Sequence, residues 1–267
     1  MIKIAYLSDA HLELQERNFA FPDADVLLLA GDICVVADLR DGFCDTTFGI
    51  NQRQFLRAVS VKYKTVIWIP GNHEYYNGNM STNQEKVNNF LKSENLTNIT
   101  YIPMGCLKVN DIKFVFASLW TDINKGNPID ISCSGIMNDY QQIMINDDAS
   151  ASGIRYLTPD DTMRLHTMHR DHIKVEVVGH DKVVVMTHHA PHILSAGDRR
   201  IDRSSVFYCC TDMEDVILDN PQIKFWIAGH THNKADYFIG DAQILSNPRG
   251  YPSEKISKSF IIETITL

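Results

Sequence analysis

The sequence predicts an α/β protein with a mixed β-sheet, and three observations lead to this class. Short runs rich in β-branched and aromatic residues recur along the chain, and several are apolar at every position, as expected for strands buried on both faces. Segments with helical periodicity separate these runs in the first third of the 267 residues. Strand-like runs dominate the last third. Strands that first alternate with helices and then follow one another indicate a mixed sheet.

The expected elements follow from apolar patterning. Strands are predicted, in chain order, at 2–7, 26–30, 65–69, 112–118, 183–187, 224–228, 242–245 and 260–265. Helices are predicted at 52–63, 84–92 and 159–173. The first helix carries Phe55, Val59 and Tyr63 at every fourth position, which places them on one face.

Capping residues mark the start of the later two helices. Ser81 and Thr82 are possible caps for the second helix. For the third, Thr158 is expected at the N-cap, Pro159 at the first helical position and Asp161 in the first turn. Each of these residue types satisfies or tolerates the unpaired N–H groups of a helix start.

The chain contains no visible repeat and no low-complexity linker, so we expect one domain over residues 1–267. The least regular stretch is 124–153, which is rich in Asn, Asp, Ser and Gly. We interpret it as a cap-like insertion within that domain.

Composition excludes several classes of protein. Hydrophobic residues make up 44% and charged residues 22%, which permits a sizeable core and excludes wholesale disorder. Lys and Arg number 25 against 33 Asp and Glu, and the net charge of −8 argues against a protein that binds duplex nucleic acid by charge. It does not exclude a phosphate ester held by metal ions, because bound cations dominate a local field.

The chain is expected to be cytoplasmic. Its N-terminal run is strand-like and unlike a signal peptide, and no apolar run approaches the roughly 18 residues that a membrane span needs. The six cysteines form no C-x-x-C pair and are expected to be reduced thiols.

Polar clusters follow five of the predicted strands at their carboxyl ends, where ligand sites of open α/β sheets assemble. They contribute Asp9 and His11, Asp32, Asn72 and His73, His188 and His189, and His230 and His232. The donors are carboxylate, amide and imidazole groups without thiolate, which suits two divalent ions such as Mn, Fe, Zn or Co. A carboxylate bridging two cations about 3.5–4 Å apart is the usual two-metal hydrolytic arrangement.

In this order, D-x-H, G-D, G-N-H-E, a strand-terminal His and G-H-x-H resemble the calcineurin-like metallophosphoesterase superfamily. The stretch N-P-R-G-Y at 247–251 and the N-D-Y turn at 138–140 are similar to those of its small bacterial and phage members. The resemblance implies a four-layer α/β/β/α sandwich and two divalent ions, with Mn favoured. It assigns the first ion to Asp9, His11 and His232, and the second to Asn72, His188 and His230, with Asp32 bridging. His73 would protonate the leaving group or stabilise the transferring phosphoryl group.

One departure from the family narrows the activity. Protein Ser/Thr phosphatases carry G-D-x-x-D-R-G, whose second Asp orients the catalytic His, whereas this chain reads G-D-I-C-V-V-A over 31–37. Protein phosphatase activity is therefore disfavoured. Another residue must orient His73.

Several residues have more than one interpretation. His189 is an alternative to His188 as a ligand, or contacts the substrate, and Arg249 is a second candidate for substrate binding. His166, His169 and His172 are spaced by three, but we interpret Leu165, Met168 and His172 as a packed helical stripe in preference to a metal site. The adjacent Cys209 and Cys210 are expected to pack in the core.

The predicted function is a metal-dependent phosphoesterase acting on phosphomonoesters or phosphodiesters through a metal-bound hydroxide, with His73 assisting departure of the alcohol. A nuclease or cyclic-nucleotide phosphodiesterase is the main alternative. A metal-binding scaffold without activity is a further one. Oligomeric state and physiological substrate stay open.

Overall fold

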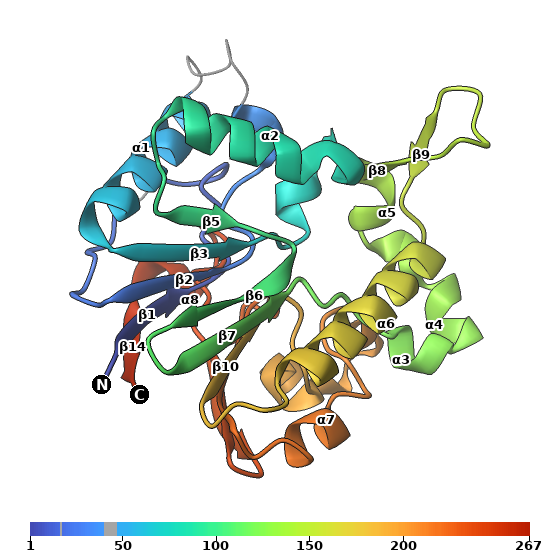
Figure 1. The fold of residues 1–267 in the computed structure, drawn as a ribbon. Coiled ribbons are helices and arrows are strands. Elements are labelled where there is room, and N and C mark those ends of the chain that lie inside the picture. The colour runs from blue at the N-terminus through green and yellow to red at the C-terminus, as the bar shows by residue number, and fades with distance from the viewer. Residues whose placement is uncertain (17, 40–46) are drawn as a thin grey trace.

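Two β-sheets form the centre of the protein (Figure 1), which a computed structural model describes over residues 1–16, 18–39 and 47–267. One sheet has the order β14-β1-β2-β3-β5. Its strands are β1 (Lys3–Leu7), β2 (Val26–Ala30), β3 (Thr65–Ile69), β5 (Ile99–Tyr101) and β14 (Glu263–Thr266). Neighbours from β1 to β5 are parallel, and β14 pairs antiparallel with β1.

The other large sheet has the order β12-β13-β11-β10-β7-β6. Its strands are β6 (Met104–Val109), β7 (Ile112–Ala117), β10 (Val183–Thr187), β11 (Ile223–Ala228), β12 (Ala235–Ile239) and β13 (Ala242–Ser246). The four central strands are parallel, and the edge strands β6 and β12 are antiparallel to their neighbours. Both sheets are therefore mixed, as predicted.

The sheets pack face to face and helices cover their outer faces. Ile4 and Leu28 of the first sheet share a buried cluster with Phe114 and Met186 of the second. Helices α1 (Thr47–Lys62) and α2 (Met80–Ser93) pack on the outer face of the first sheet, and α6 (Pro159–Glu176) and α7 (Glu214–Leu218) on that of the second. The four-layer α/β/β/α prediction is confirmed.

Short elements occupy the stretch that was expected to be irregular. A small sheet combines β4 (Gly78–Asn79), β8 (Ile143–Asn146) and β9 (Ile154–Tyr156), and the β8–β9 hairpin projects from the body in Figure 1. Between 123 and 142 lie α3 (Ile123–Gly126), α4 (Pro128–Ser132), η3 (Ser134–Ile136) and α5 (Asp139–Gln142). The remaining short helices are η1 (Val36–Leu39), η2 (His73–Tyr75), η4 (Ile193–Ile201), η5 (Arg203–Phe207) and α8 (Lys255–Lys258).

Two of the predictions about helix faces and caps need correction. Helix α2 begins earlier than expected, and its cap is Asn79, whose side chain accepts from the Ser81 N–H at 2.9 Å. Met168 on α6 is 47% exposed, so the predicted stripe is wrong. The buried face of α6 instead carries Thr162, His166, His169 and Ile173.

Other expectations hold. Thr158 and Asp161 form a reciprocal capping box, with Pro159 in the first turn of α6. The described cysteines are free thiols, whereas Cys44 lies outside the described residues. Among the helices of the described ranges, none combines the length and the apolar character that crossing a membrane requires.

Candidate metal centre

The predicted ligands meet where strands of both large sheets end. Five of them have left-handed backbone conformations, with φ of 52° at Asp9, 44° at His11, 53° at Asp32, 67° at His230 and 50° at His232. Such values are uncommon for residues other than glycine and cluster at functional sites. The loops therefore carry backbone strain where the ligand side chains converge.

The first group consists of Asp9, His11 and His232, which offer ligand atoms within 4.8 Å of one another. His232 Nε2 lies 3.0 Å from His11 Nε2 and 3.4 Å from Asp9 Oδ1. The other ring nitrogens face carboxylates: Glu13 lies 3.1 Å from His11 Nδ1, and Glu254 lies 2.8 Å from His232 Nδ1.

This arrangement places the Nε2 lone pairs of His11 and His232 close together. Because the carboxylates of Glu13 and Glu254 accept the Nδ1–H protons, each neutral ring carries a lone pair on Nε2. Two such lone pairs 3.0 Å apart repel each other unless a proton or a metal ion lies between or beside them. The donor set of this group therefore fits a divalent metal.

The second group consists of Asp32, His188 and His230, with Asn72 beside them. His188 Nδ1 donates to the Ala30 carbonyl at 2.9 Å, so its Nε2 carries the lone pair. That nitrogen lies 3.1 Å from Asn72 Oδ1, 3.1 Å from His230 Nδ1 and 3.4 Å from Asp32 Oδ2. The oxygens of Asn72 and Asp32 are acceptors that face this acceptor nitrogen, which fits a second cation.

The field at both groups favours positive charge. Burial opposes protonation of His188, but the carboxylates of Asp32 and Asp9 outweigh it and raise the pKa of the ring to about 9. Burial likewise opposes protonation of His232, while Asp9 and Glu254 raise its pKa to about 10. Cations are therefore stabilised at both positions.

The amide of Asn72 is oriented by the segment that was expected to be a cap. Its Nδ2 donates to Asp139 Oδ1 at 2.8 Å and to the Tyr76 hydroxyl at 3.0 Å. These contacts turn Oδ1 toward His188. Asp139 thus fixes the amide in the orientation that a metal ligand requires.

His73 lies beside the first group and is held by Glu13. Its Nδ1 is 2.9 Å from Glu13 Oε1, and its Nε2 is 3.3 Å from the Tyr251 hydroxyl. The ring packs on Tyr76 with centroids 4.3 Å apart. Burial opposes protonation, but Asp32 and Glu13 raise the pKa of His73 to about 9. Glu13 therefore orients and charges His73 in the absence of the Asp of the protein phosphatases.

Glu74 ties two ligand loops together. Its carboxylate accepts from the backbone N–H groups of Asp32 (2.8 Å), Ile33 (2.7 Å) and Gly71 (2.7 Å). Burial and the charge of Asp32 raise its pKa to about 7. A Cβ at Gly71 would lie 2.2 Å from Asp32 Oδ1, so only glycine permits this close approach.

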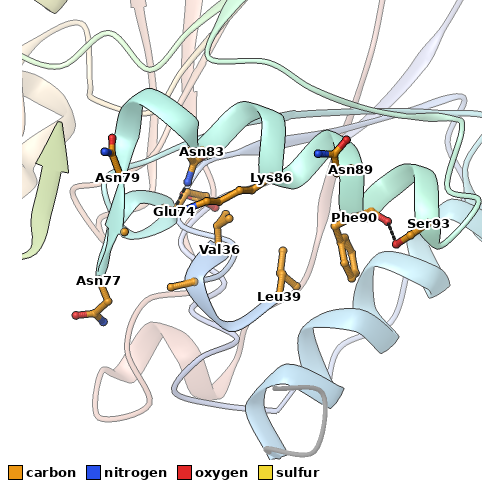
Figure 2. Close-up of a pocket in the computed structure, with 12 residues that line it drawn as sticks. Val36, Leu39, Glu74, Asn77, Asn79, Asn83, Lys86, Asn89, Phe90 and Ser93 are labelled. Carbon is orange, nitrogen blue, oxygen red and sulfur yellow. Dashed lines mark hydrogen bonds between the residues drawn. The ribbon is translucent and has the colours of Figure 1, made fainter. Parts of the chain in front are cut away.

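Two cavities lie on opposite sides of this loop pair. The one at the ligands has a volume of about 170 Å³ and is lined by Asp32, Asn72, His73, Tyr76, Ile136, Met137, Asn138, Tyr208, His230, His232, Tyr251 and Glu254. A second, of about 360 Å³, lies beneath α2 beside Glu74 and Lys86 (Figure 2). Its lining includes none of the predicted ligands. We therefore identify the smaller cavity as the candidate active site.

His189 and Arg249 lie outside the lining of that cavity. The His189 ring is buried, with Nδ1 3.2 Å from the Ser118 carbonyl, and packs 4.2 Å from the His230 ring. The Arg249 guanidinium donates to the Glu16 carbonyl at 2.5 Å and lies over Phe19. It is thus engaged with the N-terminal segment, and the structure does not bring it to the predicted substrate.

The fold and the two ligand groups define an α/β/β/α protein with a candidate metal centre, and comparison with known proteins gives the family. The family model for calcineurin-like phosphoesterases matches residues 2–234. This chain belongs to that family.

The individual proteins to which this chain is similar share 28% or less of its sequence. An uncharacterised protein of Acanthamoeba polyphaga mimivirus, L509, is 28% identical over 271 residues, covering 94% of this chain and 92% of the relative. The phosphopantetheinyl hydrolase of Mycobacterium tuberculosis has a similar structure, with a TM-score of 0.68 at 14% identity over 98% of this chain and 95% of that one. A dimetal phosphatase from Danio rerio has a TM-score of 0.51 at 15% identity, covering 100% and 92%. These structural likenesses establish the fold.

Four acidic residues of the site carried no role in the sequence-based prediction: Glu13, Glu74, Asp139 and Glu254. A signal existed for Glu13, because it continues the alternate spacing of Asp9 and His11. Glu74 stands in the G-N-H-E motif without a stated role. Glu254 and Asp139 lie far along the chain from their partners, so local spacing did not predict these contacts.

Proposed function

We propose that the protein hydrolyses a phosphate ester at a dinuclear metal centre, with Mn²⁺ as the favoured ion. The observation that supports this most is the pair of acceptor groups, each holding lone pairs 3.0–3.1 Å apart, beside one cavity that also contains His73. Asp9, His11 and His232 would hold one ion, and Asn72, His188 and His230 the other. Asp32 would bridge them.

When bound, the two ions supply Lewis-acid stabilisation of the phosphoryl oxygens and lower the pKa of attacking water. The residues of the chain do the remaining work. Asp32 and Glu13 favour the protonated ring of His73, in which Nδ1–H donates to Glu13 and Nε2 holds the proton that is delivered to the departing oxygen. Tyr251 lies against the same nitrogen and limits its position.

Within phosphate esters, we propose that the site prefers a diester to a monoester. The lining of the active-site cavity contains the carboxylates of Asp32 and Glu254 and, among the described residues, no lysine or arginine. A monoester dianion carries a second negative charge, which in such a lining only the ions and the histidines can balance. A diester carries a single charge. Tyr208, Tyr251 and Met137 offer apolar surface for its second substituent.

The test compares bis(4-nitrophenyl) phosphate with 4-nitrophenyl phosphate, using protein loaded with Mn²⁺ after chelator treatment. We expect metal-dependent turnover of both and a higher kcat/KM for the diester. Asp32→Asn is the inactive control, because it removes the predicted bridge. Turnover that is independent of metal would contradict the dinuclear mechanism, and a higher kcat/KM for the monoester would contradict the diester preference.

A further inference from the structure

A second kind of polar cluster lies beneath the loop that follows β7. Asp122, His166 and Cys210 are all buried, and each offers a ligand atom within 4.8 Å of the others. They come from three parts of the chain: Asp122 caps α3, His166 lies on the buried face of α6, and Cys210 follows η5. None of them is a ligand of the candidate metal centre.

Asp212 determines which nitrogen of the His166 ring carries the proton. His166 Nε2 lies 2.9 Å from Asp212 Oδ1, and Arg170 pairs with the same carboxylate. The Asp212 carboxylate therefore lies between the His166 ring and the Arg170 guanidinium. Because the ionised carboxylate of Asp212 accepts the Nε2–H of His166, the lone pair of this ring is on Nδ1. That nitrogen points at Cys210 Sγ, 3.7 Å away.

The Asp122 carboxylate is held in place by donors on its other side. It accepts from the Thr211 N–H at 2.9 Å and from the Lys125 N–H at 3.0 Å, and the Thr211 hydroxyl also contacts it. Carboxylate oxygens have further lone pairs after these bonds. A ligand carboxylate fixed by surrounding hydrogen bonds is typical of built metal sites.

Donor chemistry narrows the choice of ion. An imidazole nitrogen, a carboxylate oxygen and a thiolate form a set that suits Zn²⁺ and disfavours Mg²⁺ and Ca²⁺. One thiolate and one carboxylate neutralise a divalent ion, so the complex can be buried without net charge. An open cavity of about 370 Å³ lies beside two of the three residues and is lined by Asp122, His166, Arg170 and Asp212.

We propose that Asp122, His166 and Cys210 form a third metal site that binds one Zn²⁺ ion through Nδ1 of His166, Sγ of Cys210 and a carboxylate oxygen of Asp122. Binding breaks the Cys210 S–H bond, and the proton leaves to solvent as the thiolate binds the ion. The contact that the thiol makes with the Trp120 carbonyl, 3.2 Å away, is lost with that proton.

The site would join segments that pack against the candidate metal centre. Trp120, two residues before Asp122, lies 4.9 Å from the His189 ring, and Tyr208, two residues before Cys210, lies 5.1 Å from the His230 ring. Backbone φ is 71° at Leu119 and 56° at Trp120, so this loop is strained. An ion that connects it to α6 would hold both aromatic rings in position.

Cobalt substitution tests the proposal independently of activity. Protein stripped with a chelator is titrated with Co²⁺, and the sulfur-to-cobalt charge-transfer absorption in the near ultraviolet is recorded. The candidate metal centre has only nitrogen and oxygen donors, so this band reports a thiolate ligand. We expect the band in the wild type and in Asp9→Asn, and its loss in Cys210→Ser. Cys209→Ser is the matched control, because Cys209 is equally buried and belongs to no described ligand group.

Elemental analysis after Zn²⁺ loading gives the second measurement. The wild type and Cys209→Ser should retain one more ion per chain than Cys210→Ser and His166→Gln. Circular dichroism identifies a variant that fails to fold. If one ligand variant does not fold, the zinc content of the other ligand variant tests the proposal. Absence of the band in the wild type, its persistence in Cys210→Ser, or equal zinc content in folded ligand variants would overturn the proposal.

Discussion

Glu13 replaces, in this chain, the orienting Asp that protein phosphatases place in a different motif. Its carboxylate contacts Nδ1 of both His11 and His73, at 3.1 and 2.9 Å. Burial opposes ionisation of Glu13, but these two histidines outweigh it and lower its pKa. One side chain therefore connects a predicted metal ligand to the predicted proton donor.

Replacing Glu13 by Gln keeps the shape and removes the charge that favours the protonated His73 ring. Loss of an outer partner of this kind typically costs about 10–100-fold in activity or metal affinity. We expect that range for kcat/KM on an alkyl phosphate ester and a smaller loss on a nitrophenyl ester, whose leaving group needs no proton. His73→Asn should show the same contrast with a larger loss on the alkyl ester, about 10²–10⁴-fold. Equal losses on the two substrates would show that His73 does not act as a proton donor.

The adjacent histidines His188 and His189 form a matched pair for a second prediction. His188 faces Asn72 and His230, whereas the His189 Nδ1 contacts a backbone carbonyl. His188→Ala should lose one Mn²⁺ per chain and most activity, while His189→Ala should keep both ions. Calorimetric titration of each variant with Mn²⁺ measures this, and the reverse pattern would exchange the two roles.

Among the elements, the loops after β2 and β3 depend on Glu74. Its oxygens accept from four backbone N–H groups and from Trp68 Nε1 at 3.1 Å. Glu74→Gln puts an amide NH₂ where one of these oxygens stood, so at least one buried donor is left without an acceptor. We expect the free energy of unfolding to fall by about 1–3 kcal/mol. Urea unfolding measures it, with the exposed Glu85→Gln as control; a loss no greater than that of the control would exclude the role.

Helix α6 gives a prediction for pH. Burial lowers the pKa of His169 from 6.5 to about 4, and its Nδ1 has no hydrogen-bond partner in the described chain. Between pH 4 and 6.5 the His169 ring binds a proton in the unfolded chain but not in the folded chain. The free energy of unfolding therefore rises with pH over this range. The contribution approaches about 3 kcal/mol across the window.

His169→Gln should therefore remove part of the acid destabilisation between pH 6.5 and 4. Urea unfolding at a series of pH values compares the slope of unfolding free energy in wild type, His169→Gln and His180→Gln, where His180 lies in the loop before β10. An unchanged slope in His169→Gln would show that the ring protonates freely in the folded state.

At the scale of the whole molecule, the buried strands and their ends were predictable, whereas the edge strands β5, β6 and β12 were not. Runs such as 26–30 and 183–187 are apolar throughout because both faces are covered, and the polar residues that follow them mark the site. The edge strands β6 and β12 are half exposed and carry no such run. The β5 strand has three residues, too few for a pattern.

Contacts between distant segments could not be predicted from local patterns. Glu254 meets His232 and Asp139 meets Asn72 only through the packing of the whole chain. The guanidinium of Arg249 was expected near the substrate, but its Nη2 group donates to Glu16 and Asn18 of the N-terminal segment instead. Residue type and spacing predicted the ligand groups that the structure brings together, whereas the residues that orient them required the structure.

The central claim is that two ions are held by Asp9, His11 and His232 on one side and by Asn72, His188 and His230 on the other. Anomalous diffraction from a crystal of Mn²⁺-loaded protein tests it most directly. We predict two manganese peaks about 3.5–4 Å apart, one at each ligand group, with Asp32 contacting both. A single peak, or none at these residues under Mn²⁺ saturation, would contradict the account.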